Sequence, residues 1–227
     1  MQLHAAQFDN QFLRKIQLIV ARIGLNISFI NSEKKTFSIV CKVKSETNMV
    51  LTLNEASQIF ASVRDTTKIP GDVAEVGVYM GGSAKLICEA KGNRCLHLFD
   101  TFEGLPEVSE SRDSARFHKN QYSCTLEYVK RLLSKYPNIF FYKGMFPSTA
   151  DPVSDRQFSF VHLDVDLYES TKSCLEFFYP RMNRGGIIIS HDYIDSKGVK
   201  TAFQKYFKNK PEPVLELTDS QCLVMKS

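Results

Sequence analysis

The sequence contains no tryptophan, no Cys-x-x-Cys pair and no apolar run of membrane length. Its cysteines are scattered singly, several of them inside apolar runs: Cys41, Cys88, Cys95, Cys124, Cys174 and Cys222. This spacing argues against a zinc site or a disulfide framework and predicts reduced, mostly buried thiols. The first ten residues also lack the basic start and apolar core of a signal peptide. Together these absences predict a cytoplasmic protein with no membrane association.

Charge of one sign is not concentrated either. The net charge is +4, and the one basic run, Lys205–Lys210, is interpreted as the solvated face of a helix, so no nucleic-acid partner is expected. With 227 residues, of which 43% are hydrophobic and 24% charged, the chain is long enough for one α/β domain and a short extension.

From residue 72 onward, strand-like apolar runs alternate with helical patterns. The predicted strands are Asp72–Gly77, Cys95–Asp100, Asn138–Lys143, Phe158–Asp164 and Gly186–Ser190, and the predicted helices are Ser83–Ala90, Thr125–Tyr136 and Ser170–Met182. Such alternation predicts βαβ units and a doubly wound, mostly parallel sheet. The tail, Pro213–Met225, is predicted to be an antiparallel hairpin, and the long polar segment Glu103–Gln121 a substrate loop.

The N-terminal part has a different pattern. Apolar residues recur every three or four positions over residues 8–25, which predicts an amphipathic helix, and a second helix is expected from Asn54 to about Thr66. Residues 26–48 show no clear pattern. We therefore expect a helical cap over residues 1–50 and a main domain over residues 51–227. The first helix could pack as a lid in cis or across a homodimer, and the sequence leaves both open.

Two predicted strands end in polar pairs. Asp164 and Asp166 stand one residue apart at the end of one strand, and His191 and Asp192 follow the next. Residues i and i+2 of a strand point to the same face, and parallel strands end at the same edge of a sheet. The pattern predicts a metal-assisted active site at that edge.

The turn after the first strand indicates which cofactor the chain can hold. A dinucleotide fingerprint would place its second glycine where this chain has Tyr79, and a phenol there would crowd a pyrophosphate. The turn suits a nucleoside ligand without phosphate, such as S-adenosylmethionine. Asp100, at the end of the next strand, is placed to accept both ribose hydroxyls. Glu75 could meet the ligand's ammonium group or order the turn; helix capping or a salt bridge is the alternative for both acids.

Four blocks, residues 69–83, 98–106, 162–171 and 179–193, together resemble the macrocin O-methyltransferase (TylF-like) family of metal- and S-adenosylmethionine-dependent sugar O-methyltransferases. The resemblance implies a class I methyltransferase fold with a C-terminal antiparallel hairpin. It also implies O-methylation of a small hydroxylated acceptor, a sugar of a glycan or secondary metabolite. The implied cofactor contacts are Met49, Glu75, Gly77, Gly81, Ser83, Asp100, Thr101, Phe102, Ser123 and Gly144.

By the same resemblance, Asp164 and Asp192 are metal ligands and Asp166 is the general base. The family's characterised sugar enzymes end in Asp-Asp-Tyr where this chain has His191-Asp192-Tyr193. Three outcomes are open: His191 ligates a softer cation such as Mn²⁺ or Zn²⁺, Mg²⁺ binds through the two aspartates alone, or no metal binds and His191 is a base or substrate contact. His162 is expected to be a core histidine.

Three other interpretations remain at this point. They are a metal-independent methyltransferase acting on a non-sugar acceptor, a nicotinamide-dependent oxidoreductase, and a non-catalytic module that binds S-adenosylmethionine.

Overall fold

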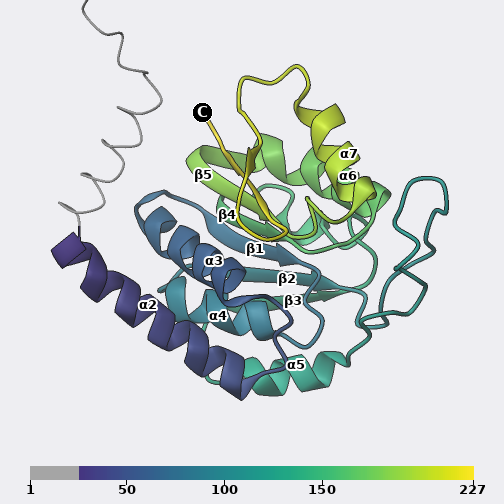
Figure 1. Ribbon diagram of the computed structural model, residues 1–227. Helices are drawn as coiled ribbons and strands as arrows, with labels where there is room; N and C mark the ends of the chain where they lie inside the picture. Colours follow the sequence, from purple (N-terminus) through teal and green to yellow (C-terminus); the bar gives the residue numbers. More distant parts are fainter. Residues whose placement is uncertain (1–25) are drawn as a thin grey trace, which may run out of the picture. The chain divides into compact units, whose positions relative to one another are not determined.

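The computed structural model describes residues 26–227 and contains a seven-stranded sheet with the strand order β3-β2-β1-β4-β5-β7-β6 (Figure 1). The strands are β1 (Asp72–Val76), β2 (Leu96–Asp100), β3 (Ile139–Lys143), β4 (Phe158–Leu163), β5 (Met182–Ser190), β6 (Leu215–Glu216) and β7 (Cys222–Met225). Strands β1 to β5 pair parallel with one another, whereas β7 runs antiparallel to both β5 and β6. The predicted fold class, including its C-terminal hairpin, is confirmed.

The helices are α2 (Asn26–Glu46), α3 (Leu53–Asp65), α4 (Gly82–Ala90), α5 (Leu126–Leu133), α6 (Tyr168–Phe178) and α7 (Lys197–Phe207), with 3₁₀ turns η1 (Thr66–Lys68), η2 (Asp151–Val153) and η3 (Tyr179–Arg181). Helix α2 occupies the region where the sequence showed no clear pattern. The predicted helix at residues 8–25 lies outside the described residues. Within residues 26–227, no helix combines the length and apolar character needed to cross a bilayer.

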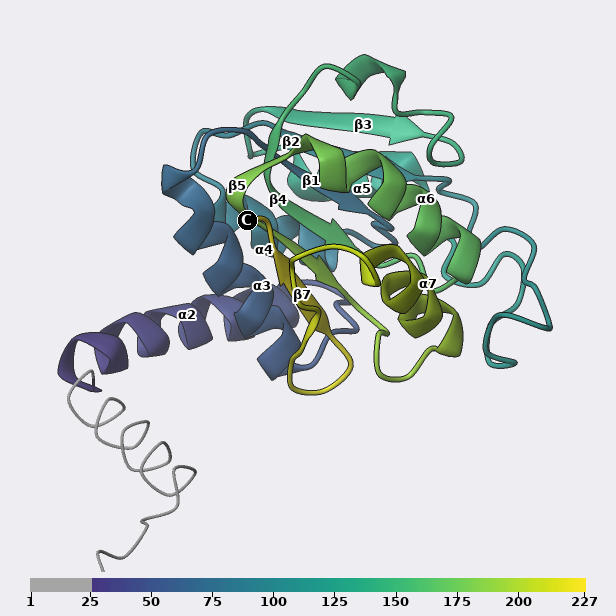
Figure 2. The ribbon, with the colours of Figure 1, turned by 90° about the horizontal axis from the view of Figure 1, so that it is seen from above.

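Residues 39–227 form one compact unit; the described residues before them belong to another and are helical. In the larger unit, alternate strand residues serve opposite faces of the sheet. Val73, Leu98 and Phe160 pack in a cluster with residues of α3, α4 and α5, whereas Val161 and Ile188 pack with residues of α6 and α7. Figure 2 shows these two helical layers on either side of the strands. Both faces are therefore buried, as the continuous apolar runs predict.

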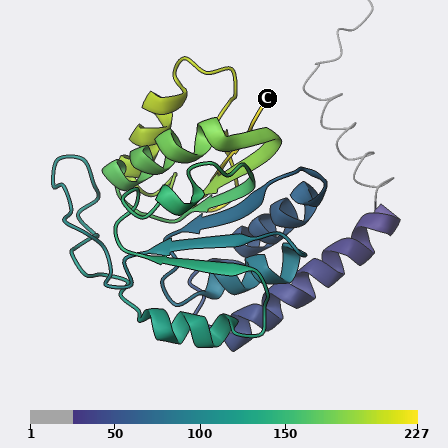
Figure 3. The ribbon, with the colours of Figure 1, turned by 180° about the vertical axis from the view of Figure 1, so that it is seen from behind.

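The parallel strands deliver their carboxyl ends to one edge of the sheet, and Gly77 begins the turn after β1 there. Its φ is +86°, and a Cβ at this position would lie 1.8 Å from the carbonyl oxygen of Asp164. Glycine is therefore required at position 77, because the backbone after β4 leaves no room for a side chain there. The connection from β2 to α5 extends from the same edge, in teal at the left of Figure 3. This edge carries the candidate site.

Candidate active site

A cavity of about 600 Å³ lies at the carboxyl edge of the sheet. Its wall comes from the segment before α3, the ends of β1, β2, β4 and β5, and the β2–α5 connection. Ten residues predicted for the site line it: Met49, Gly77, Ser83, Asp100, Thr101, Gly144, Asp164, Asp166, His191 and Asp192. The structure therefore brings most of the predicted residues to one place.

Four predicted cofactor residues do not reach the cavity wall. Gly81 caps α4 with a φ of +75°, Phe102 is buried in the core, and Ser123 is exposed just ahead of α5. Glu75 is fully buried, and its Oε1 lies 2.8 Å from Nδ1 of His162. The side chain of Glu75 points into the interior toward His162, so a direct contact between Glu75 and the cofactor remains a prediction.

The Glu75–His162 pair joins β1 to β4 inside the sheet. Burial is the largest influence on Glu75 and raises the pKa of its carboxyl, although the bond to His162 opposes this. His162 is a core histidine, as predicted. The pair supports the strand that leads into the glycine turn.

Asp100 orders the backbone of two turns at once. Its Oδ2 accepts hydrogen bonds from the backbone N–H groups of Val78 at 2.6 Å and Tyr79 at 3.0 Å, and its Oδ1 accepts one from Phe102 at 2.7 Å. Tyr79 and Phe102 both have positive φ, of 47° and 55°, so these bonds hold conformations that side chains disfavour. A carboxylate offers about four acceptor positions, so capacity remains for a ligand hydroxyl.

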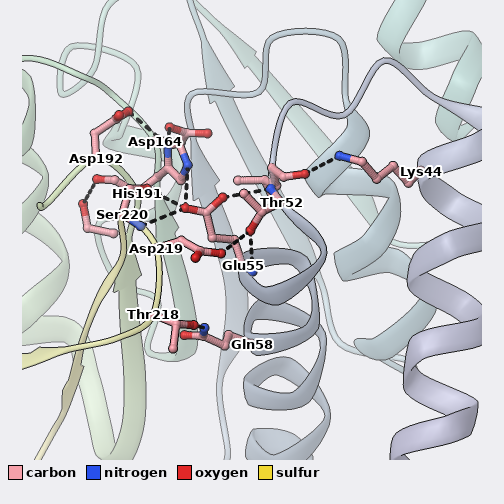
Figure 4. A network of polar contacts seen from close by, with 12 residues as sticks. Lys44, Thr52, Glu55, Gln58, Asp164, His191, Asp192, Thr218, Asp219 and Ser220 are labelled. Carbon is pink, nitrogen blue, oxygen red and sulfur yellow. Dashed lines mark hydrogen bonds and ion pairs between the residues drawn. The ribbon is translucent and has the colours of Figure 1, made fainter. Parts of the chain in front are cut away.

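The segment between α2 and α3 covers the start of α4. Met49 lies so close that a Cβ on Gly82 would stand 2.6 Å from the Cβ of Met49. Lys44 donates to the carbonyl oxygens of Met49, at 3.3 Å, and of Leu51 (Figure 4). This lysine therefore holds the segment in place above the glycine turn.

Asp164, His191 and Asp192 form a cluster whose ligand atoms all lie within 4.8 Å of one another. Nδ1 of His191 is 3.2 Å from Asp164 and 3.0 Å from Asp192. Burial disfavours the imidazolium, but Asp164 and the neighbouring carboxylates outweigh it and raise the pKa of His191 above its ordinary value. Two carboxylate oxygens and one imidazole nitrogen are a donor set that fits a divalent cation.

Asp166 lies beside this cluster with a φ of +61° and is 8% exposed. Burial and the negative charges of Asp164 and Asp192 raise its pKa well above the usual range of an aspartate. Ser196 joins the turn after β4 to the turn after β5. Its hydroxyl donates to the backbone carbonyl oxygen of Asp166 at 3.0 Å, and its N–H donates to the backbone carbonyl oxygen of Asp192 at 2.8 Å. Asp166 is therefore a buried carboxyl group in the cavity wall, beside the cluster of Asp164, His191 and Asp192.

Sequence reasoning missed Glu55, which is 2% exposed on α3 and whose Oε1 lies 3.3 Å from Nε2 of His191. It also missed Arg116, whose guanidinium forms an ion pair with Asp192. The one available signal for Glu55 was the Thr52-x-x-Glu55 capping box, which the structure contains. That signal locates the start of a helix, but it does not say what the carboxylate faces.

Comparisons with known proteins agree with this geometry. The model of the macrocin-O-methyltransferase (TylF) family matches residues 51–225. The 8-demethyl-8-(2,3-dimethoxy-alpha-L-rhamnosyl)-tetracenomycin-C 4'-O-methyltransferase of Streptomyces olivaceus is 33% identical over 140 residues, which are 55% of this chain and 54% of that protein. The demethyldecarbamoylnovobiocin O-methyltransferase of Streptomyces niveus is 29% identical over 153 residues, 61% of this chain and 58% of that protein.

The chain thus spans a little more than half the length of these curated relatives. Among solved structures, the O-methyltransferase NovP has a TM-score of 0.69 and 25% identity, with coverage of 79% of this chain and 82% of NovP. The calicheamicin methyltransferase CalS11 shares the fold, with a TM-score of 0.66, 19% identity, and coverage of 86% and 92%. The chain belongs to the macrocin-O-methyltransferase (TylF) family, as its four sequence blocks predicted.

Proposed function

We propose that this chain is an S-adenosylmethionine-dependent O-methyltransferase whose acceptor is a small hydroxylated molecule, a sugar of a glycan or secondary metabolite. The observation that carries the proposal is the pairing, across one cavity, of a glycine turn with a cluster of carboxylates and an imidazole. Family membership supports the reaction class, and the rhamnosyl group in the name of the Streptomyces olivaceus relative supports the acceptor class.

On the β1–β2 side, S-adenosylmethionine, when bound, supplies a methyl group already activated by its sulfonium. We assign the turn from Gly77 to Ser83 to its methionine part and Asp100 to the ribose hydroxyls. Met49, Thr101 and Gly144 line the same wall. Gly81 and Phe102 would act by shaping the two turns, and Glu75 by supporting β1. A contact by Ser123 remains a prediction.

On the β4–β5 side, the acceptor hydroxyl must lose its proton before it can attack. We assign this proton to Asp166, because its carboxyl lines the cavity beside Asp164 and Asp192. Asp164, His191 and Asp192 would hold a divalent cation, Mg²⁺ or a softer ion, which would stabilise the developing alkoxide. Arg116, at the rim of the cavity, would contact the acceptor.

A metal-independent reaction is the second candidate, and one observation favours it. Nδ1 of His191 lies within hydrogen-bond distance of both Asp164 and Asp192. A protonated ring in that position would itself supply positive charge beside the alkoxide. The two candidates differ in whether added metal changes the rate.

The experiment that tests the proposal is calorimetric titration of the purified protein with S-adenosylhomocysteine, with and without Mg²⁺. We expect micromolar affinity, about −8 kcal/mol. Absence of binding in both buffers would overturn the methyltransferase proposal. Methyl transfer to a panel of glycosides and catechols, with and without EDTA, would then separate sugar from non-sugar acceptors and the metal-dependent from the metal-independent candidate.

The division into a cap at residues 1–50 and a methyltransferase domain at residues 51–227 remains a prediction. The cytoplasmic location and the homodimer also remain predictions.

A further inference from the structure

Glu55 accepts hydrogen bonds from three parts of the chain at once. Its Oε2 accepts the N–H of Thr52 at 2.9 Å, and its Oε1 accepts the N–H of Ser220 at 3.0 Å and the Ser220 hydroxyl at 2.6 Å. Nε2 of His191 lies 3.3 Å from the same Oε1. Figure 4 shows the carboxylate between the start of α3, the C-terminal hairpin and His191.

This arrangement decides which way the imidazole of His191 faces. Because Glu55 can only accept, Nε2 must carry the proton of that contact. Nδ1 faces Asp164 and Asp192, at 3.2 and 3.0 Å, and donates a proton to these carboxylates until a cation takes the place of that proton. Histidines that ligate metals commonly donate their other ring N–H to a carboxylate in this way, which fixes both the tautomer and the ring orientation.

The environment of Glu55 explains why it can hold that role. It is 2% exposed, and each of its carboxylate oxygens accepts a hydrogen bond from a backbone N–H group. Thr52 is itself held, because its hydroxyl donates to Asp219 at 2.6 Å. The carboxylate is therefore fixed at both oxygens before it meets the ring.

We propose that Glu55 is a positioning residue that sets the orientation of His191, so that Nδ1 completes the site formed with Asp164 and Asp192. The proposal rests on the function proposed above, because it assigns Nδ1 to the acceptor side of that site. It also makes residues 55 and 191 a matched pair. The substitution His191→Asp would add a fourth carboxylate to those of Glu55, Asp164 and Asp192, and the new side chain would have no proton to donate to Glu55.

The chain offers a matched control for this pair. Gln58, one turn further along α3, donates through Nε2 to the Thr218 hydroxyl at 2.5 Å and so joins the same helix to the same hairpin. Gln58→Ala disturbs that junction without touching His191. Ser220→Ala removes the hydroxyl that donates to Glu55, but it keeps the backbone N–H donor and the contact between Glu55 and His191.

The primary test is a long-range ¹H–¹⁵N spectrum of the full-length protein labelled at histidine, with His191 assigned through His191→Asn. In the wild-type protein, Nε2 of His191 should have the shift of a protonated nitrogen. Glu55→Gln should move both His191 nitrogen shifts, whereas Gln58→Ala and Ser220→Ala should not. An unprotonated Nε2 in the wild type, which requires no variant to fold, would overturn the proposal, as would unchanged shifts in Glu55→Gln.

The second test is a double-mutant cycle read as Mn²⁺ affinity by calorimetry. Glu55→Gln alone should weaken binding by about 10- to 100-fold. His191→Asp should be less harmful in combination with Glu55→Gln than alone, because a glutamine amide can donate to the new carboxylate. Strictly additive effects would overturn the pairing. Loss of S-adenosylhomocysteine binding in the wild type would instead count against the proposed function and leave the spectroscopic result standing.

Discussion

The two sides of the cavity are built in different ways. On the β1–β2 side, the wall is mainly backbone: a glycine turn, and N–H groups gathered by Asp100. On the β4–β5 side, the wall is charged side chains, in which His191 contacts Asp164 through Nδ1 and Glu55, from a helix distant in sequence, through Nε2. Under the proposed function, the first side would bind the cofactor through backbone shape, whereas the second would set the proton affinities of the groups that meet the acceptor.

If the two sides are separate in function, Asp166→Asn should have the largest effect and should act on one side alone. Removal of a general base should lower kcat by about 10²- to 10⁴-fold. Affinity for S-adenosylhomocysteine should be unchanged, since Asp166 belongs to the acceptor side. Steady-state rates and calorimetry would check both points, with Asp155→Asn, on an exposed residue, as the control. Normal turnover would remove Asp166 from the mechanism.

Gly77→Ala, on the β1–β2 side, should instead lower stability and cofactor binding. The new Cβ would lie 1.8 Å from the carbonyl of Asp164 at a φ of +86°, so strain and overlap should together cost more than about 3 kcal/mol of unfolding free energy. Cofactor binding should be lost. Gly92→Ala is the matched control, because Gly92 also has positive φ, +62°, but a Cβ there meets nothing within 4 Å. Equal effects of the two substitutions on thermal unfolding would show that the close approach to Asp164 is unimportant.

Asp100→Ala should have an intermediate effect. It leaves three backbone N–H groups without their acceptor. A hydrogen bond to a charged group contributes about 1.5–3 kcal/mol to stability. We expect S-adenosylhomocysteine to bind about 10- to 100-fold more weakly, as measured by calorimetry. Glu103→Ala, in the same connection but pairing only with Lys143 at the surface, should bind normally. Wild-type affinity in the Asp100 variant would contradict the assignment.

Arg116→Ala should have the smallest effect. The Arg116 side chain is 44% exposed although that of Asp192 is only 9% exposed, so solvent screens the ion pair in part and its loss should cost about 1 kcal/mol. The acceptor KM should rise by about fivefold or less, with cofactor affinity unchanged. Arg112→Ala, which removes a pair with Glu169 outside the cavity, provides the comparison in the same assay. If Arg116→Ala changed only the affinity for the cofactor, Arg116 would have to be assigned to cofactor binding and not to acceptor binding.

The same division explains what could be predicted from the sequence. The fold and the glycine turn depend on local signals, namely strand periodicity and the requirement for glycine at position 77, which are visible in short stretches. The strand-end acids were predictable because parallel strands end together. Glu55 was not, because its role depends on how α3 lies against β5 and the hairpin, and the capping box carries no information about that packing.

The direction of the Glu75 side chain could not be predicted for a related reason. Its place at the end of β1 suggested a ligand contact, but alternation along the strand turns this side chain toward His162 on β4. Asp164 and Asp166 both line the cavity although β4 ends at Leu163 and Asp166 has a φ of +61°, so the turn after the strand, and not alternation, places Asp166 there. The sequence did not show which face of β1 met the cavity, since both faces of the strand are buried.

The contact between Glu55 and Ser220 spans 165 positions of the chain. During translation at about 5–20 residues per second, the helix that carries Glu55 is made roughly 8–30 s before its hydroxyl partner exists. Until then, this acid has neither donor that Ser220 provides. The last of the parallel strands, β5, ends at Ser190 and is therefore synthesised before Ser220. Newly made chains should therefore be able to pair their five parallel strands first, and should complete β7 and the hydrogen bonds to Glu55 last.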